Sequence, residues 1–242
     1  LYKNADCVVV LAEGLQDYVI KKGAKKVVWL PNGPDLEKFS PLSKRTFSNV
    51  FTKSNPFKLI YAGAHGVAND LGNVIEAAKS LLDYPIKIIL IGDGPEKKDL
   101  IYKAKDLENV LFKDPVSKEI IPEILASADA ILISLGDVKL FQYGISPNKL
   151  YDAYALQRPV VSTLKGSVNN EINKYQVGIG CEPGSPQLLA NSIIKMYKKS
   201  NKERELMGIK GRKLAETIYS RNIINNKYFD LMNSLFANNG KF

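Results

Sequence analysis

Residues 58–95 read KLIYAGAHGVANDLGNVIEAAKSLLDYPIKIILIGDGP and contain a complete strand–loop–helix–strand unit. The apolar run 58–62 and the β-branched run Ile86–Ile91 have strand length, and a loop that contains glycine follows each of them. Residues 71–82, between them, have the apolar spacing of a helix. A helix that joins two strands in this way is typical of an α/β fold with a parallel sheet.

The same alternation continues in both directions along the chain. Strands are expected at 7–11, 26–30, 58–62, 86–91, 110–112, 130–134, 159–162 and 177–181, and helices at 15–22, 71–82, 96–106, 118–127, 147–156, 186–199, 202–219 and 223–236. The polar segment between residues 40 and 56 has no apolar period and is expected to link two domains. The pattern predicts a doubly wound parallel sheet preceded by a smaller α/β piece.

The composition is that of a folded globular protein, with 242 residues of which 45% are hydrophobic and 24% charged. No apolar run reaches the roughly 18 residues that a transmembrane helix needs. Cys7 and Cys181 stand far apart outside any CxxC motif, so neither a disulfide framework nor a zinc site is expected, which fits a cytoplasmic location. The chain begins Leu-Tyr-Lys, without Met or a signal peptide, and is expected to be part of something longer.

The net charge of +9 is concentrated at the two ends of the chain. Residues 1–53 carry nine Lys and Arg against five Asp and Glu, and residues 195–242 carry eleven against four. A basic surface can attract an anionic membrane or a phosphorylated substrate, and it can equally be a solvated lysine-rich surface. Nucleic acid is not expected as a partner, because no recognition motif and no alternation of aromatic and basic residues is present.

Ligands of a doubly wound sheet bind at the carboxyl ends of its strands, so the loops there are candidate sites. The loop Gly63–Asp70 contains His65, the only histidine of the chain, and a structural and a functional role for it are equally plausible. The loop Gly92–Pro95 lacks the third glycine of the dinucleotide fingerprint, which favours a simple tight turn.

The third candidate loop, Gly144–Asp152, leads into a helix. Ser146 is expected to be the N-cap, which would leave the N–H groups of Asn148, Lys149 and Leu150 free and pointing towards the sheet edge. A helix N-terminus carries about half a positive charge and suits a phosphate.

Two side chains of that helix suggest an anionic ligand with a sugar. Lys149 opposes the helix dipole, so a helix built for stability alone would not favour it. Asp152, one turn further, could accept hydrogen bonds from a ribose diol or could simply stabilise the helix start.

Short motifs follow one another along the chain: Ala5-Asp6, Val9-Val10-Leu11 and Gly14-Leu15; Pro31-Asn32-Gly33, Asp35 and Phe39-Ser40-Pro41; Ile91-Gly92-Asp93-Gly94-Pro95; Ala128-Asp129-Ala130; and Ser146-Pro147-Asn148-Lys149-Leu150-Tyr151-Asp152 with Arg158-Pro159-Val160-Val161-Ser162. In this order they resemble glycosyltransferase family 4 (group 1). The resemblance implies a Rossmann-like α/β domain, the C-terminal half of a GT-B glycosyltransferase, with the Ser-Pro-Asn-Lys variant of the family motif.

The resemblance also implies a division of the chain. Residues 1–40 would be the last βαβ remnant of the N-terminal acceptor domain and residues 41–56 the linker. Residues 57–221 would be the nucleotide-sugar-binding domain, and residues 222–242 the helix that crosses back onto the missing N-terminal domain.

By position in the family motifs, the donor would be bound by Gly63, Gly66, Asp114, Val116, Ser146, Asn148, Leu150 and Asp152. The family's paired acids correspond to Gly144 and Asp152, so the first acid is absent. The first loop also lacks the family's Arg/Lys pair, and His65 and Lys149 are the nearest substitutes for its catalytic role. Neither a metal ion nor a cofactor is expected.

The function implied is metal-independent transfer of a hexose or N-acetylhexosamine from a nucleotide-sugar, expected to be UDP-linked, with retention of configuration. The acceptor would be a lipid-linked glycan or a surface polysaccharide, reached from the cytoplasm or from the inner face of an anionic membrane. The 242-residue chain alone is expected to be inactive. Two alternatives remain: a nucleotide-sugar-binding domain without transfer activity, and an NAD-dependent oxidoreductase, against which the failed glycine fingerprint argues.

Overall fold

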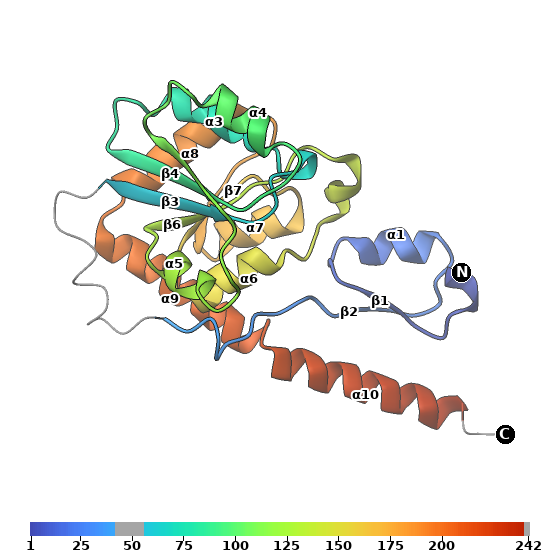
Figure 1. Cartoon of the computed structure of the whole chain (residues 1–242). Helices are drawn as coiled ribbons and strands as arrows, with labels where there is room; N and C mark the ends of the chain where they lie inside the picture. Colours follow the sequence, from blue (N-terminus) through green and yellow to red (C-terminus); the bar gives the residue numbers. More distant parts are fainter. Residues whose placement is uncertain (42–55, 240–242) are drawn as a thin grey trace.

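The structure is a computed structural model that describes residues 1–41 and 56–239 and contains two α/β units (Figure 1). The larger unit is built on a six-stranded sheet and the smaller, N-terminal unit on a two-stranded sheet. Most of the expected linker 41–56 lies outside the described residues. The expected domain boundaries remain predictions.

The large sheet is parallel throughout, as predicted. Its strands are β3 (Phe57–Ala62), β4 (Ile86–Ile91), β5 (Val110–Lys113), β6 (Ala130–Ile133), β7 (Val160–Ser162) and β8 (Gly178–Gly180), in the spatial order β5-β4-β3-β6-β7-β8. The chain winds outwards from β3 in one direction and from β6 in the other. A doubly wound sheet opens a crevice at the carboxyl ends of its strands where the order reverses, here between β3 and β6.

Helices cover both faces of the large sheet, and their apolar faces complete two separate cores. They are α3 (Leu71–Lys79), α4 (Lys97–Lys103), α5 (Ile121–Ala126), α6 (Asn148–Ala155), α7 (Ser167–Lys174), α8 (Pro186–Lys198) and α9 (Asn201–Thr217). Successive strand residues point to opposite faces, so Leu59 and Tyr61 pack with α3 and α8. Ile60 packs on the other face with α5, α6 and α9.

The smaller unit consists of β1 (Val8–Val10), α1 (Leu15–Lys21) and β2 (Val27–Trp29), with β1 and β2 parallel. Val8 and Val9 are half-buried, and Val10 is the buried residue of β1. The unit contacts the large one at the segment that precedes α6. The rings of Tyr18 and Tyr143 lie 4.7 Å apart, and a side chain at Gly14 would meet the carbonyl of Tyr143.

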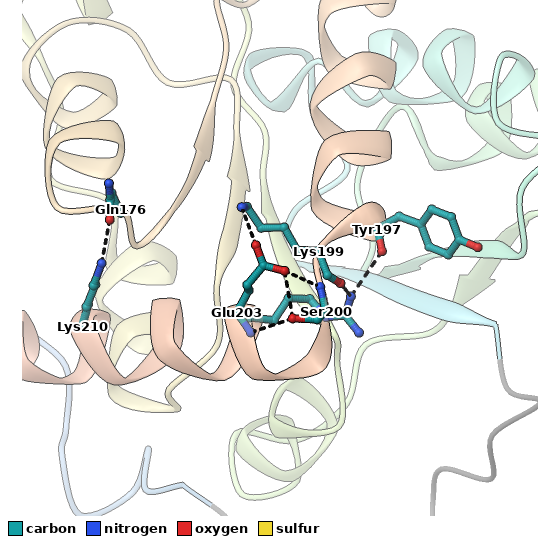
Figure 2. Close-up of polar contacts among 7 residues, drawn as sticks. Gln176, Tyr197, Lys199, Ser200, Glu203 and Lys210 are labelled. Atoms are coloured by element: carbon teal, nitrogen blue, oxygen red, sulfur yellow. Dashed lines mark hydrogen bonds and ion pairs between the residues drawn. The ribbon is translucent and has the colours of Figure 1, made fainter.

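The junction between α8 and α9 is held by side chains of its own residues (Figure 2). The Ser200 hydroxyl accepts a hydrogen bond from the Glu203 N–H, and Glu203 accepts one from the Ser200 N–H at 2.7 Å, which together form a capping box. Lys210 on α9 donates to the side-chain oxygen of Gln176 at 2.7 Å. Several lysines of these helices are exposed, and attraction to an anionic surface remains a prediction.

The last helix, α10 (Arg221–Asn239), extends beyond the large unit (Figure 1). Phe229 and Phe236 on it are 66% and 70% exposed, so this helix has apolar side chains without a buried environment. A return onto an N-terminal domain remains a prediction. Within the described residues, no helix combines the length and the apolarity that crossing a membrane requires.

Candidate functional site

The three candidate loops meet at the carboxyl edge of the large sheet. A side chain at Gly92 would lie 1.9 Å from the carbonyl oxygen of Gly63, and one at Gly63 would lie 2.2 Å from the Nζ atom of Lys149. Gly63 and Gly92 also have φ angles of +151° and +142°, which side chains disfavour. The glycines therefore allow the loops after β3 and β4 to approach each other and Lys149.

Lys149, in the first turn of α6, lies against Tyr61 at the end of β3. Its Nζ atom donates to the Tyr61 hydroxyl at 2.9 Å and lies 4.3 Å from the centre of that ring. The Tyr61 hydroxyl in turn donates to the carbonyl of Ala64 at 2.8 Å. Burial lowers the pKa of Lys149 to about 8 and raises that of Tyr61. The Lys149 amine is therefore held in one position. A bound anion would compensate its positive charge more fully than the hydroxyl and ring of Tyr61 do.

Asp152 shares a small pocket of about 90 Å³ with Lys149, and Phe39 forms part of its wall. Burial raises the pKa of Asp152 to about 7. Arg221 and Lys38 lower this pKa, whereas Asp35 raises it. A cation and a carboxyl group one helical turn apart thus border the same cavity.

His65 is completely buried in the first loop, between the rings of Tyr61 and Phe112. Neither ring nitrogen has a hydrogen-bond partner of normal geometry, although the backbone of Ile91 lies close enough to raise the pKa weakly. Burial, and then the charge of Lys97, lower the pKa of His65, so the ring is neutral at pH 7. The catalytic role expected for it requires this loop to move, and remains a prediction.

Asp114 and Val116 line a second, larger pocket of about 440 Å³ beside β4 and β5. Asp114 is exposed and forms an ion pair with Lys97 at 2.8 Å, which lowers the pKa of the carboxyl group. Gly66 is in the first loop with an ordinary φ of −122°, and its Cβ position is open space. These residues are therefore not in the pocket shared by Lys149 and Asp152.

The start of α6 differs from the expectation. The helix begins at Asn148, and its N-cap is Pro147, without a side-chain cap hydrogen bond. The prediction that Ser146 is the N-cap was therefore wrong. Pro147 has extended angles (φ −82°, ψ 115°), and the helix starts one residue later than expected. The Ser146 hydroxyl instead accepts a hydrogen bond from the Asn32 N–H at 2.8 Å.

The expectation that the Leu150 N–H is free was also wrong, because this group donates to the carbonyl of Pro147 at 3.0 Å. The amides of Asn148 and Lys149 precede that bond in the first turn, and the Asn148 side chain is exposed. The helix start therefore offers these two amides rather than three.

Sequence reasoning did not identify three residues that contact or influence the candidate site: Tyr61, which bonds to Lys149; Lys97, which acts on His65; and Arg221, which acts on Asp152. Tyr61 was hidden in the apolar pattern of β3, and Arg221 is separated from Asp152 by most of the C-terminal region. Lys97 could have been noticed as a cation just after the Gly92–Pro95 loop. Within that loop the Lys97 N–H donates to the Gly94 carbonyl at 3.1 Å, and Gly94 also lies close to the backbone of His65.

Two features define the class of this domain: a doubly wound parallel sheet, and loops that converge with a helix N-terminus at its carboxyl edge. They are those of a Rossmann-like domain. Residues 43–214 match the family described as Glycosyl transferases group 1, which accounts for most of the chain. The chain belongs to this family.

Among curated proteins, N-acetyl-alpha-D-glucosaminyl L-malate synthase of Bacillus anthracis is 28% identical over 153 residues, which are 62% of this chain and 37% of that protein. The chain spans about a third of the length of the curated relatives it matches. Among solved structures, Anabaena Alr3699/HepE in complex with UDP-glucose has a TM-score of 0.79 at 19% identity and covers 96% of this chain and 65% of its own.

The C-terminal domain of the glycosyl transferase group 1 family protein LpcC from Francisella tularensis has a TM-score of 0.61 at 21% identity, covering 77% of this chain and 98% of its own. Likeness at this level of identity concerns the fold. The fold is that of GT-B glycosyltransferases, as the resemblance implied.

Proposed function

We propose that this chain is the C-terminal, donor-binding part of a family 4 glycosyltransferase with the Ser-Pro-Asn-Lys motif, and that it binds a UDP-sugar at the start of α6. The observation that carries the proposal is that Lys149 lies against Gly63 and shares a pocket with Asp152 at the carboxyl edge of the large sheet. The structural neighbour Alr3699/HepE, which was solved in complex with UDP-glucose, supports the choice of donor.

The diphosphate would lie at the N-terminus of α6, against the amides of Asn148 and Lys149 and the ammonium group of Lys149. The backbone of Gly63 and Gly66 would border it, because glycine leaves room for close approach. These groups would stabilise the charge that develops on the leaving diphosphate without a metal ion. Among the described residues, no cluster of three or more His, Cys, Asp and Glu side chains could hold one.

Asp152 would accept hydrogen bonds from the ribose hydroxyls, and the base would lie near Asp114 and Val116. The reaction would be a retaining transfer of a hexose or N-acetylhexosamine to a lipid-linked glycan or surface polysaccharide. The acceptor would be bound by an N-terminal domain of which only residues 1–40 belong to this chain.

A second candidate function is donor binding without transfer. The observation that favours it is Gly144, which occupies the position of the family's first acid and has a φ of +90°. A larger residue is strained there, so no acidic side chain can simply replace it. Donor turnover by the complete protein would exclude this alternative.

The test is calorimetric titration of the chain with UDP in the presence of EDTA. The wild-type chain should bind, and Asp152→Ala should lose about 1.5–3 kcal/mol of binding free energy, the usual contribution of a hydrogen bond to a charged group. Asp230→Ala, which removes an exposed carboxylate from α10, should bind as the wild type does. Unchanged affinity in Asp152→Ala, or binding that needs Mg²⁺, would contradict the proposed site.

A further inference from the structure

Asn32 and Ser146 are 114 positions apart in the sequence and are joined by two hydrogen bonds. The Asn32 N–H donates to the Ser146 hydroxyl at 2.8 Å, and the Asn32 side-chain amide donates to the Ser146 carbonyl at 3.0 Å. Both the backbone and the side chain of each residue take part. Asn32 thereby fixes the position and the orientation of Ser146, two residues before α6 begins.

The Ser146 hydroxyl also connects inwards to the first turns of α6. It lies 3.1 Å from the hydroxyl of Tyr151, a residue that is only 3% exposed. The ring of Tyr151 lies 4.4 Å from that of Tyr219. Tyr151 cannot move without disturbing this packing, so Ser146 is held from both sides.

Asn32 is itself anchored by its neighbour Gly33. A side chain at Gly33 would lie 2.0 Å from the carbonyl of Tyr219, and Arg221 donates to the Gly33 carbonyl at 3.1 Å. The segment that contains Asn32 is therefore fixed where α9 leads into α10. The two hydrogen bonds to Ser146 transmit this position to the start of α6.

From these contacts we infer that Asn32 and Ser146 are positioning residues for the donor. They hold the first turn of α6, and with it Lys149, at the place where a diphosphate would bind, although Asn32 does not contact the diphosphate. The inference rests on the proposed function, since it assigns the donor to this helix start. In this role the Ser146 hydroxyl bonds to groups of the protein and does not contact the donor.

The competing interpretation is that the two bonds merely stabilise the contact between the units. Loss of stability alone would lower the melting temperature without changing the affinity of the folded protein. A positioning role changes the UDP dissociation constant and the local order of residues 148–150. These readouts therefore separate the two interpretations.

The experiment compares four variants of the whole chain by calorimetry with UDP. Asn32→Ala and Ser146→Ala should each raise the dissociation constant about 3- to 10-fold, the equivalent of one ordinary hydrogen bond. Ser146→Thr keeps the hydroxyl and should restore binding to within about 2-fold of the wild type. Asn109→Ala is the matched control, since the Asn109 amide also donates to a distant carbonyl, that of Ala78 at 2.8 Å, and it should not change the affinity.

Hydrogen exchange at the amide of Leu150, which donates to the carbonyl of Pro147 in the first turn of α6, provides a readout that needs no ligand. Exchange should accelerate in Asn32→Ala and Ser146→Ala and stay at the wild-type rate in Ser146→Thr and Asn109→Ala. Unchanged affinity and unchanged exchange in the two alanine variants would overturn the inference. If the wild-type chain does not bind UDP, the proposed function fails, and exchange alone then decides whether these residues position α6.

Discussion

Lys149 and Asp152 are one helical turn apart, and burial moves the pKa of each towards neutrality. The pKa of Asp152 rises to about 7 and that of Lys149 falls to about 8. Both shifts have the same cause, because a low-dielectric pocket disfavours the charged form of either group. Only between these two pH values are the carboxylate and the ammonium ion both largely present.

UDP affinity should therefore pass through a maximum at a pH of about 7–8. Below it, protonation removes the acceptor at Asp152, and above it, deprotonation removes the cation at Lys149. Titration calorimetry from pH 5.5 to 9.5 would measure the profile. Asp152→Asn should remove the acid limb that belongs to Asp152, and Lys149→Met the alkaline limb; variants with the wild-type profile would exclude these groups.

The sequence predicted that Lys149 and Asp152 lie one turn apart on the same helix, because this spacing is a local property. It could not predict Tyr61, whose hydroxyl accepts a hydrogen bond from Lys149 across 88 positions of sequence. Burial, which causes both pKa shifts, likewise depends on segments such as the one with Phe39. The candidate residues on one helix could therefore be predicted from the sequence. The burial and the distant contacts that shift their pKa values could not.

At the scale of elements, the capping box at the start of α9 makes a measurable contribution to stability. Ser200→Ala removes the hydroxyl that accepts from the Glu203 N–H and should lower the free energy of unfolding by about 1 kcal/mol. Ser185→Ala is the control, because Ser185 caps α8 by a single 3.3 Å hydrogen bond without a capping box. Urea denaturation of both variants checks this. If Ser185→Ala lost as much free energy of unfolding as Ser200→Ala, or more, the larger contribution expected of the capping box would be contradicted.

The strands and most helices were predicted within a few residues, because alternating strand-length and helix-length apolar runs are strong local signals. Helix α7 was missed. Its eight residues, Ser167–Lys174, contain only Val168 and Ile172 as large apolar side chains, too few for a recognisable period. The start of α6 was misplaced because serine before proline fits an N-cap, and the hydrogen bonds that hold Ser146 elsewhere come from the distant Asn32.

For the molecule as a whole, we expect the 242-residue chain to show no acceptor-dependent transfer. Reactants must be held together in near-attack geometry, and under the proposed function the acceptor wall would belong to an N-terminal domain of which this chain would contain only residues 1–40. The assay is incubation with UDP-glucose or UDP-N-acetylglucosamine and a panel of glycan and lipid-linked acceptors. Slow release of UDP in the absence of acceptor is compatible with this expectation, and a glycosylated acceptor is not.

The contact of Gly33 with Tyr219 and Arg221 has a mechanical consequence. The segment around Gly33, which follows β2, packs against Tyr219–Arg221, where α9 leads into α10. The neighbouring residue, Asn32, is bonded to the segment that leads into α6. Any movement of the N-terminal unit relative to the large one would therefore be restrained beside α6, the helix at which we propose the donor binds.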